Sequence, residues 1–179
     1  VRSRVFGFEI LTAPFVVAHL QIGLALQREG VSLEGEARPG VFLTNSLTGW
    51  EPPKEPQEIL FPELRREKEK AEEVKREKPI LVILGNPPYN GYAGIAVGEE
   101  GALGDIYRTT ERAPSPSGHG LNDLYVRFFR IAERQIVESN GHGIVSYISN
   151  YSWLDGLSHS GMREHYLNVF DEIWVDSLN

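Results

Sequence analysis

Pro79-Ile80-Leu81-Val82-Ile83-Leu84-Gly85-Asn86-Pro87-Pro88-Tyr89 is the stretch that decides the fold of this 179-residue chain. Its first seven residues form the most apolar strand-like run in the sequence, which predicts a buried parallel strand. The two prolines that follow remove two N–H donors and fix two φ angles. The predicted strand therefore ends in a stiff turn that starts with an amide side chain and finishes with an aromatic ring.

The Asn86-Pro87-Pro88-Tyr89 turn offers carbonyl oxygens and a side-chain amide as acceptors, and the tyrosine ring offers a flat apolar face. These groups suit a planar substrate that carries an NH₂ group. The alternative is an ordinary turn at the end of a strand, where Asn and Pro are common anyway.

Composition places the chain among single globular domains, or large parts of one. Hydrophobic residues make up 41% and charged residues 24%, and there is no cysteine, which excludes disulfides and thiolate metal sites. No apolar run reaches the length of a membrane span, and nothing indicates a signal peptide. We expect a cytoplasmic protein without a membrane partner. Because the first residue is Val1, we also expect a segment of a longer chain.

The net charge of −7 argues against a nucleic-acid footprint over the whole surface. It leaves open a local basic cleft, or phosphate contacts made by another domain.

Two further strands are expected before residue 50. Residues 5–10 predict a strand that ends in Glu9, followed by a helix capped by Thr12 and stopped at Gly30. An acidic residue at such a strand end commonly binds ribose hydroxyls, although Glu9 could equally cap the helix or lie at the surface. His19 is expected to be a packed histidine rather than a ligand. Residues 41–47 predict the second strand, which ends in polar residues that include Asn45.

The middle of the chain holds a charged helix and a long loop. Residues 57–78 alternate in charge sign at helical spacing, which favours a solvated helix held by i,i+4 pairs over a phosphate-binding one. Residues 90–120 are rich in Gly, Ser, Pro and charge, and are interpreted as an insertion that is either a mobile cover or disordered.

The last third is predicted to continue the alternation of helices and strands. Asn122 is expected to cap a helix over 123–138, with an inner face made by Leu124, Phe128, Ile131, Ala132 and Ile136. A strand over 143–150, a helix over 159–170 and a strand over 171–178 follow. The pattern predicts an α/β layer fold with a mostly parallel sheet, in which ligands bind at the carboxyl ends of the strands. Glu9, Asn45, the tetrapeptide and Asn150 all fall at such ends.

These residues resemble the DNA adenine-N6 methyltransferases. Asn86-Pro87-Pro88-Tyr89 is similar to their catalytic motif, Phe6-Gly7-Phe8-Glu9-Ile10 to their ribose-binding segment, and residues 143–156 with 162–164 and 170–173 to the later part of that domain. The match looks closest to large single-chain restriction–modification proteins of the type ISP and type IIG kinds. It spans nearly the whole chain, so residues 1–179 are predicted to be a partial methyltransferase domain.

The resemblance implies a Rossmann-like methyltransferase fold with helices on both faces of the sheet. It also implies S-adenosylmethionine as cofactor and double-stranded DNA as substrate, with the target adenine flipped out of the helix. Asn86 and Pro87 would accept the two amino hydrogens, Pro88 would stiffen the loop, and Tyr89 would stack on the base. Glu9 would bind the cofactor ribose and Asn45 would lie near the cofactor adenine, although many relatives have an acidic residue there. Helicase or nuclease and target-recognition domains of the parent chain are the implied partners.

The family's glycine-rich cofactor loop, and the first strand that leads into it, have no counterpart in these residues. We therefore expect the isolated segment to bind S-adenosylmethionine weakly or not at all. Two alternatives stay open: a methyltransferase acting on protein glutamine or ribosomal RNA guanine, and a non-catalytic interaction fragment that keeps the fold.

Overall fold

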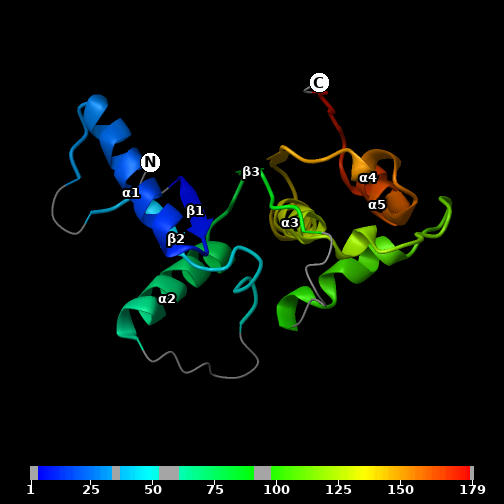
Figure 1. Ribbon diagram of the computed structural model, residues 1–179, viewed down its shortest axis with the longest axis horizontal. Coiled ribbons are helices and arrows are strands. Elements are labelled where there is room, and N and C mark those ends of the chain that lie inside the picture. The colour runs from blue at the N-terminus through cyan, green and yellow to red at the C-terminus, as the bar shows by residue number, and fades with distance from the viewer. Residues whose placement is uncertain (1–3, 34–36, 53–60, 91–97, 178–179) are drawn as a thin grey trace. The chain divides into compact units, whose positions relative to one another are not determined.

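The computed structural model describes residues 4–33, 37–52, 61–90 and 98–177, which divide into two compact units (Figure 1). The first unit is Val1–Lys78 and the second is Pro79–Asn179, and each is described by itself. The described helices include none that is both long and apolar enough to cross a lipid bilayer.

The first unit is a strand–helix–strand–helix arrangement. Strand β1 (Phe6–Glu9) pairs in parallel with β2 (Gly40–Leu43), and helix α1 (Thr12–Arg28) makes the crossover between them. Helix α2 (Pro62–Glu77) packs on this pair, where Phe42, Ala71 and Val74 form a small core with Phe6 and Phe8. The predicted strands and helices of this unit are confirmed over the described residues, with shorter strands than expected, and residues 57–60 of the predicted charged helix lie outside the described residues.

The start of α1 differs from the prediction. Thr12 is the first helical residue and not its cap, because Leu11 occupies the cap position without a side-chain bond. The Glu9 carboxylate accepts the Leu11 N–H at 2.8 Å instead. The helix ends as predicted at Gly30, whose φ of +75° suits glycine. His19 is half-buried and bonds to the Val41 carbonyl oxygen at 3.1 Å, which agrees with a packing role.

The second unit is built on another parallel pair, β3 (Val82–Gly85) and β4 (Ile144–Tyr147). Its helices are α3 (Leu124–Glu133), continued by a π-helical turn over Arg134–Asn140, α4 (Ser152–Asp155) and α5 (Ser160–Val169). Short 3₁₀ turns cover Gly98–Glu100, Leu103–Arg108, Gly120–Asn122 and Leu157–His159. The core lies between α3 and α5 and is largely aromatic, with Tyr107, Leu121, Tyr125, Val126, Phe129, Met162 and Tyr166 buried.

Parallel pairing and the α/β class are confirmed, but the described strands form two separate pairs and not one continuous sheet. The predicted burial of the strand before the tetrapeptide is wrong. Val82 is 52% exposed and Leu84 is 74% exposed, since β4 and the helices of this unit leave these side chains uncovered. The two parallel pairs are compatible with a Rossmann-like fold, in which helices would cover more of the sheet.

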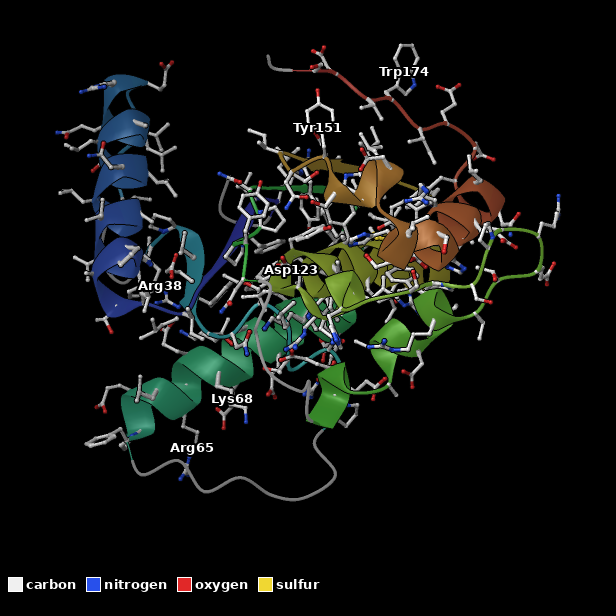
Figure 2. All side chains as sticks on the ribbon, turned by 45° about the vertical axis from the view of Figure 1, so that its right-hand side comes forward. Arg38, Arg65, Lys68, Asp123, Tyr151 and Trp174 are labelled. Carbon is white, nitrogen blue, oxygen red and sulfur yellow. The ribbon has the colours of Figure 1, made fainter. Side chains whose placement is uncertain are left out.

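Two predictions about the second unit need correction: the cap and buried face of α3, and the final strand. The cap of α3 is Asp123 and not Asn122. Of the predicted inner face, Ile131, Ala132 and Ile136 are buried as expected. Leu124 and Phe128 are only half-buried, and Tyr125 and Phe129 are buried instead. Residues 171–177 carry no regular secondary structure and pair with no strand of the described structure, so the predicted final strand is not formed there. Figure 2 shows Trp174 on this segment, and its side chain is 88% exposed.

The described part of the predicted insertion, residues 98–120, is packed and hydrogen-bonded, and residues 91–97 lie outside the described residues. Tyr107 is fully buried and its hydroxyl donates to the Glu133 carboxylate at 2.5 Å. The Glu164 carboxylate accepts the backbone N–H groups of Glu111, Arg112 and Ala113 at 2.7–3.2 Å. This part of the loop is therefore anchored on α5, in contrast to the expectation of a mobile cover or disorder.

Candidate functional site

The tetrapeptide leaves β3 directly, because Gly85 is the last residue of the strand and Asn86 follows it. Pro87 is buried, whereas Asn86 and Pro88 are exposed. Each proline fixes its own φ, and each restricts the residue before it to extended conformations. The loop therefore presents the Asn86 amide on a backbone with little freedom to move.

Tyr89 is the aromatic end of the loop and is 49% exposed. Its hydroxyl lies 3.2 Å from the Ile148 carbonyl oxygen, to which it donates, and 3.5 Å from the Asn86 side-chain oxygen. Ile148 in turn donates its N–H to Gly85 at 3.0 Å. The phenol is therefore tied to the carboxyl ends of both strands, while half of the residue stays open to solvent.

The N-terminus of α3 forms hydrogen bonds with the end of the loop. The Asp123 carboxylate, visible at the start of the helix in Figure 2, accepts the Asn90 N–H at 2.9 Å. The Leu124 N–H donates to the Asn90 carbonyl oxygen at 3.3 Å. The residue that follows the tetrapeptide is thus held by a pair of hydrogen bonds to one helix terminus.

Behind Tyr89 lie two buried polar side chains that sequence reasoning missed. Tyr125 is 1% exposed and packs edge-to-face on Tyr89 with ring centroids 6.0 Å apart. His159 is 2% exposed, and its Nε2 lies 2.8 Å from the Tyr125 hydroxyl. Only the helical spacing of Tyr125 could have indicated burial, and no local signal joins it to a histidine 34 residues away.

Burial settles the protonation of this pair. Desolvation, followed by the nearby Asp123 and Tyr89, raises the pKa of Tyr125 well above its ordinary value. Desolvation, followed by the charge of Arg163, lowers the pKa of His159. At neutral pH the phenol is therefore protonated and the imidazole neutral, and the two share a hydrogen bond whose direction depends on the tautomer of His159.

In the first unit, Glu9 and Asn45 lie together at the carboxyl ends of β1 and β2. Glu9 is the last residue of β1, and its carbonyl oxygen accepts the Thr44 N–H at 2.8 Å. One carboxylate oxygen of Glu9 accepts the Leu11 N–H. The Asn45 side-chain oxygen accepts the Leu47 N–H at 2.9 Å, which closes a turn after β2.

Lys75 of α2 holds the loop that carries Asn45. Its ammonium donates to the carbonyl oxygens of Asn45 and Thr48 at 2.6 and 2.7 Å, and lies 4.7 Å from the centre of the Phe8 ring. The side chain is 1% exposed, so the prediction of a solvated helix is wrong at this position. The predicted i,i+4 pairs are confirmed, because Glu72 pairs with Lys68 and Arg76, but Ala71 and Val74 of α2 are buried as well.

The sequence-predicted residues therefore form two clusters. Asn86, Pro87, Pro88 and Tyr89 gather with Asn90 at the end of β3, and Glu9 and Asn45 gather at the end of β1 and β2. Asn150, three residues past β4, accepts the Ser152 N–H through its side chain at 3.1 Å and so forms another turn at a strand end. Within each pair of strands, the polar groups lie at the edge where α/β sheets bind ligands.

No known protein-family model matches the chain, and no curated protein matches its sequence. Among solved structures, the ATP-dependent type ISP restriction-modification enzyme LlaBIII bound to DNA is similar with a TM-score of 0.66 and 23% identity over 88% of this chain. The DrdV–DNA complex is similar with a TM-score of 0.69 and 24% identity over 95%. This chain spans 10% and 16% of those two chains. At such identities the likeness shows a shared fold.

The residues at the ends of β1 and β2 fit a nucleoside-containing cofactor such as S-adenosylmethionine. A carboxylate such as that of Glu9 accepts two hydroxyl groups at once, which suits the vicinal hydroxyls of a ribose. The amide of Asn45 offers both a donor and an acceptor, which suits the edge of a purine. Glu9 uses one carboxylate oxygen for the Leu11 N–H, and each oxygen has more than one lone pair.

Proposed function

We propose that this chain is part of a restriction–modification protein and methylates the N6 amino group of adenine in DNA. The observation that carries the proposal is the geometry of the tetrapeptide: an exposed Asn86 amide on a proline-stiffened loop, beside a half-exposed Tyr89 ring anchored at its hydroxyl. The fold shared with two DNA-bound proteins, one of them a restriction-modification enzyme, supports the same assignment.

The amide and the ring would act on the base in different ways. The target adenine must leave the duplex, since its amino group is out of reach while the base is stacked. The Asn86 side-chain oxygen and the Pro87 carbonyl oxygen would then accept the two amino hydrogens, and Tyr89 would stack on the face of the base. Two acceptors on the hydrogens turn the nitrogen lone pair away from the loop and increase its electron density.

S-adenosylmethionine, when bound, supplies an electrophilic methyl group. Glu9 would hold it by the ribose and Asn45 by the adenine. Catalysis by this chain would rest on holding the amino group in line and excluding water, because the loop offers hydrogen-bond acceptors and no nucleophile.

The direct test is methyl transfer by the full-length protein that carries this sequence, with unmethylated genomic DNA and labelled S-adenosylmethionine. We expect N6-methyladenine at one recurring sequence. Asn86→Ala removes one acceptor and is expected to lower the rate by at least about a hundredfold, as for the loss of one preorganised hydrogen-bonding group in other enzymes.

Tyr89 and a surface control complete the experiment. Tyr89→Ala removes the stacking face, whereas Tyr89→Phe keeps it and loses only the hydroxyl bonds to Ile148 and Asn86, so the second variant should retain much more activity. Asn168→Ala, at an exposed position on α5, should have no effect. Methyl transfer to protein or to ribosomal RNA, with none to DNA, would overturn the proposal.

A further inference from the structure

Tyr89 is half-exposed, and contact with solvent does not fix the plane of its ring. A tyrosine has two side-chain torsions, and the last one is broad. The hydroxyl bond to Ile148 fixes the tip of the ring, but a ring held at one point can still rotate about the line through that point and its Cβ. A second contact on the ring itself is needed to set its angle.

Tyr125 makes that second contact. Its ring meets Tyr89 at an interplanar angle of 61° with centroids 6.0 Å apart, an edge-to-face arrangement that favours one orientation. Tyr125 also packs edge-to-face on Phe129 at 6.0 Å and is 1% exposed, so the core of this unit holds it in place. It is too deeply buried to touch a bound base.

His159 holds the far end of Tyr125. Its Nε2 is 2.8 Å from the Tyr125 hydroxyl, and its Nδ1 is 3.1 Å from the Ser158 hydroxyl, so both ring nitrogens have partners. Two glycines make room for the imidazole. A Cβ on Gly120 would lie 2.6 Å from its Cε1, and one on Gly156 would lie 3.0 Å from its Nδ1.

The same helix terminus holds the backbone on the other side of Tyr89, through Asp123 and Asn90. The Tyr89 hydroxyl is therefore held by Ile148 and its ring by Tyr125. The backbone N–H of the next residue, Asn90, is held by Asp123. These contacts come from two segments, the N-terminus of α3 and the end of β4, and leave little freedom for a side chain that is half in solvent.

We propose that Tyr125 and His159 are positioning residues that hold the Tyr89 ring at the angle at which it stacks on the flipped target base. This inference rests on the proposed function. The pair acts on the reaction through Tyr89 alone, and displacement of a positioned group by about 1 Å is enough to cost on the order of a hundredfold in rate.

The test is Tyr125→Phe in the full-length protein, which keeps the ring and removes only the hydroxyl that His159 holds. We expect kcat/KM for DNA to fall between about tenfold and about a hundredfold, with the KM for S-adenosylmethionine unchanged. Tyr166→Phe is the matched control, because Tyr166 is also buried and hydrogen-bonded, to Phe129 at 3.3 Å, but has no ring contact with Tyr89.

A stacking readout separates positioning from a structural role. With 2-aminopurine in place of the target adenine, emission rises when the base leaves the duplex and is quenched when it stacks on a ring. Tyr125→Phe should emit more than the unaltered protein, and Tyr166→Phe should not. Adding His159→Gln to Tyr125→Phe should change the emission little further, because the two side chains act as a unit.

Two results would overturn the inference, and they differ from each other. If the unaltered protein methylates adenine but Tyr125→Phe matches Tyr166→Phe in rate and emission, the positioning role alone fails. If the unaltered protein transfers no methyl group to DNA adenine, the proposed function fails and this inference fails with it.

Discussion

The Lys75 ammonium donates a hydrogen bond to the Asn45 carbonyl oxygen at 2.6 Å, and so ties the last turn of α2 to the loop that follows β2. The same ammonium reaches Thr48 at 2.7 Å. A single buried charge from one helix thus fixes both ends of the turn that carries a proposed cofactor-binding residue.

Lys75→Met is expected to destabilise the first unit by about 2–4 kcal/mol, because the apolar chain fills the space but leaves buried carbonyl oxygens without their charged donor. Urea unfolding of the protein measures this change. The control is Lys70→Met on the same helix, where the side chain is exposed and little change is expected. Equal losses in the two variants would show that the buried contacts contribute nothing.

The Glu9 carboxylate has an observed role in the turn before α1, where it accepts the Leu11 N–H, and a proposed role in cofactor binding, and two substitutions separate them. Glu9→Gln keeps a side-chain oxygen for the Leu11 N–H but loses the charge. We expect stability within about 0.5 kcal/mol of the unaltered protein, and S-adenosylmethionine binding weakened by about tenfold because charge-assisted bonds are lost.

Glu9→Ala removes both roles and should also lower stability by about 1 kcal/mol, the usual net contribution of one hydrogen bond. Calorimetric titration of the full-length protein with S-adenosylmethionine and thermal unfolding provide the two readouts. If Glu9→Gln binds the cofactor as well as the unaltered protein does, the Glu9 carboxylate only stabilises the turn before α1.

The sequence predicted what local patterns control and failed where distant contacts decide. The parallel strands and their polar carboxyl ends follow from apolar runs closed by Gly, Pro and Asn, and these are confirmed. Asn122 and Asp123 are equally good caps by type, so residue type alone could not decide which of them caps α3. Lys75 looks like any other lysine of a charged helix until loop carbonyls 27 and 30 residues away are placed around it.

The exposure of β3 could not have been predicted from its apolar run, which is typical of a strand covered on both faces. In the described structure β3 has β4 as its neighbour, and the side chains of Val82 and Leu84 are open to solvent. The tetrapeptide is different, because two prolines impose the same stiff loop whatever packs around it.

Glu164 is expected to hold the loop over residues 111–113 only while it is ionised. The N–H groups of Ala113, Glu111 and Arg112 lower the pKa of this carboxyl. A carboxyl whose folded-state pKa is depressed stabilises the fold above its ordinary pKa, and this contribution is lost as the pH falls through the folded value. Glu164→Ala should therefore speed amide hydrogen exchange at residues 111–113 at neutral pH.

The matched control for that experiment is Glu111→Ala, which removes a carboxylate from the same loop but leaves its backbone N–H bonded to Glu164. Exchange at the three amides should stay slow in this variant. Fast exchange in the unaltered protein at neutral pH would contradict the anchored loop.

His159 is expected to make the protein less stable as the pH falls, whereas a salt-bridged histidine makes a protein more stable. Burial and the charge of Arg163 lower its pKa, against the weaker opposing effects of Gly120, Asp123 and Asp155. As pH falls below about 6.5, the unfolded chain takes up a proton that folded His159 resists, so stability falls by at most about 1.4 kcal/mol per pH unit. His159→Gln should flatten this slope between about pH 5 and pH 7, whereas His142→Gln, at an exposed position, should leave it unchanged. The measurement is urea unfolding of both proteins at each pH. If stability changes with pH equally in the His159 variant and the unaltered protein, the slope comes from other groups.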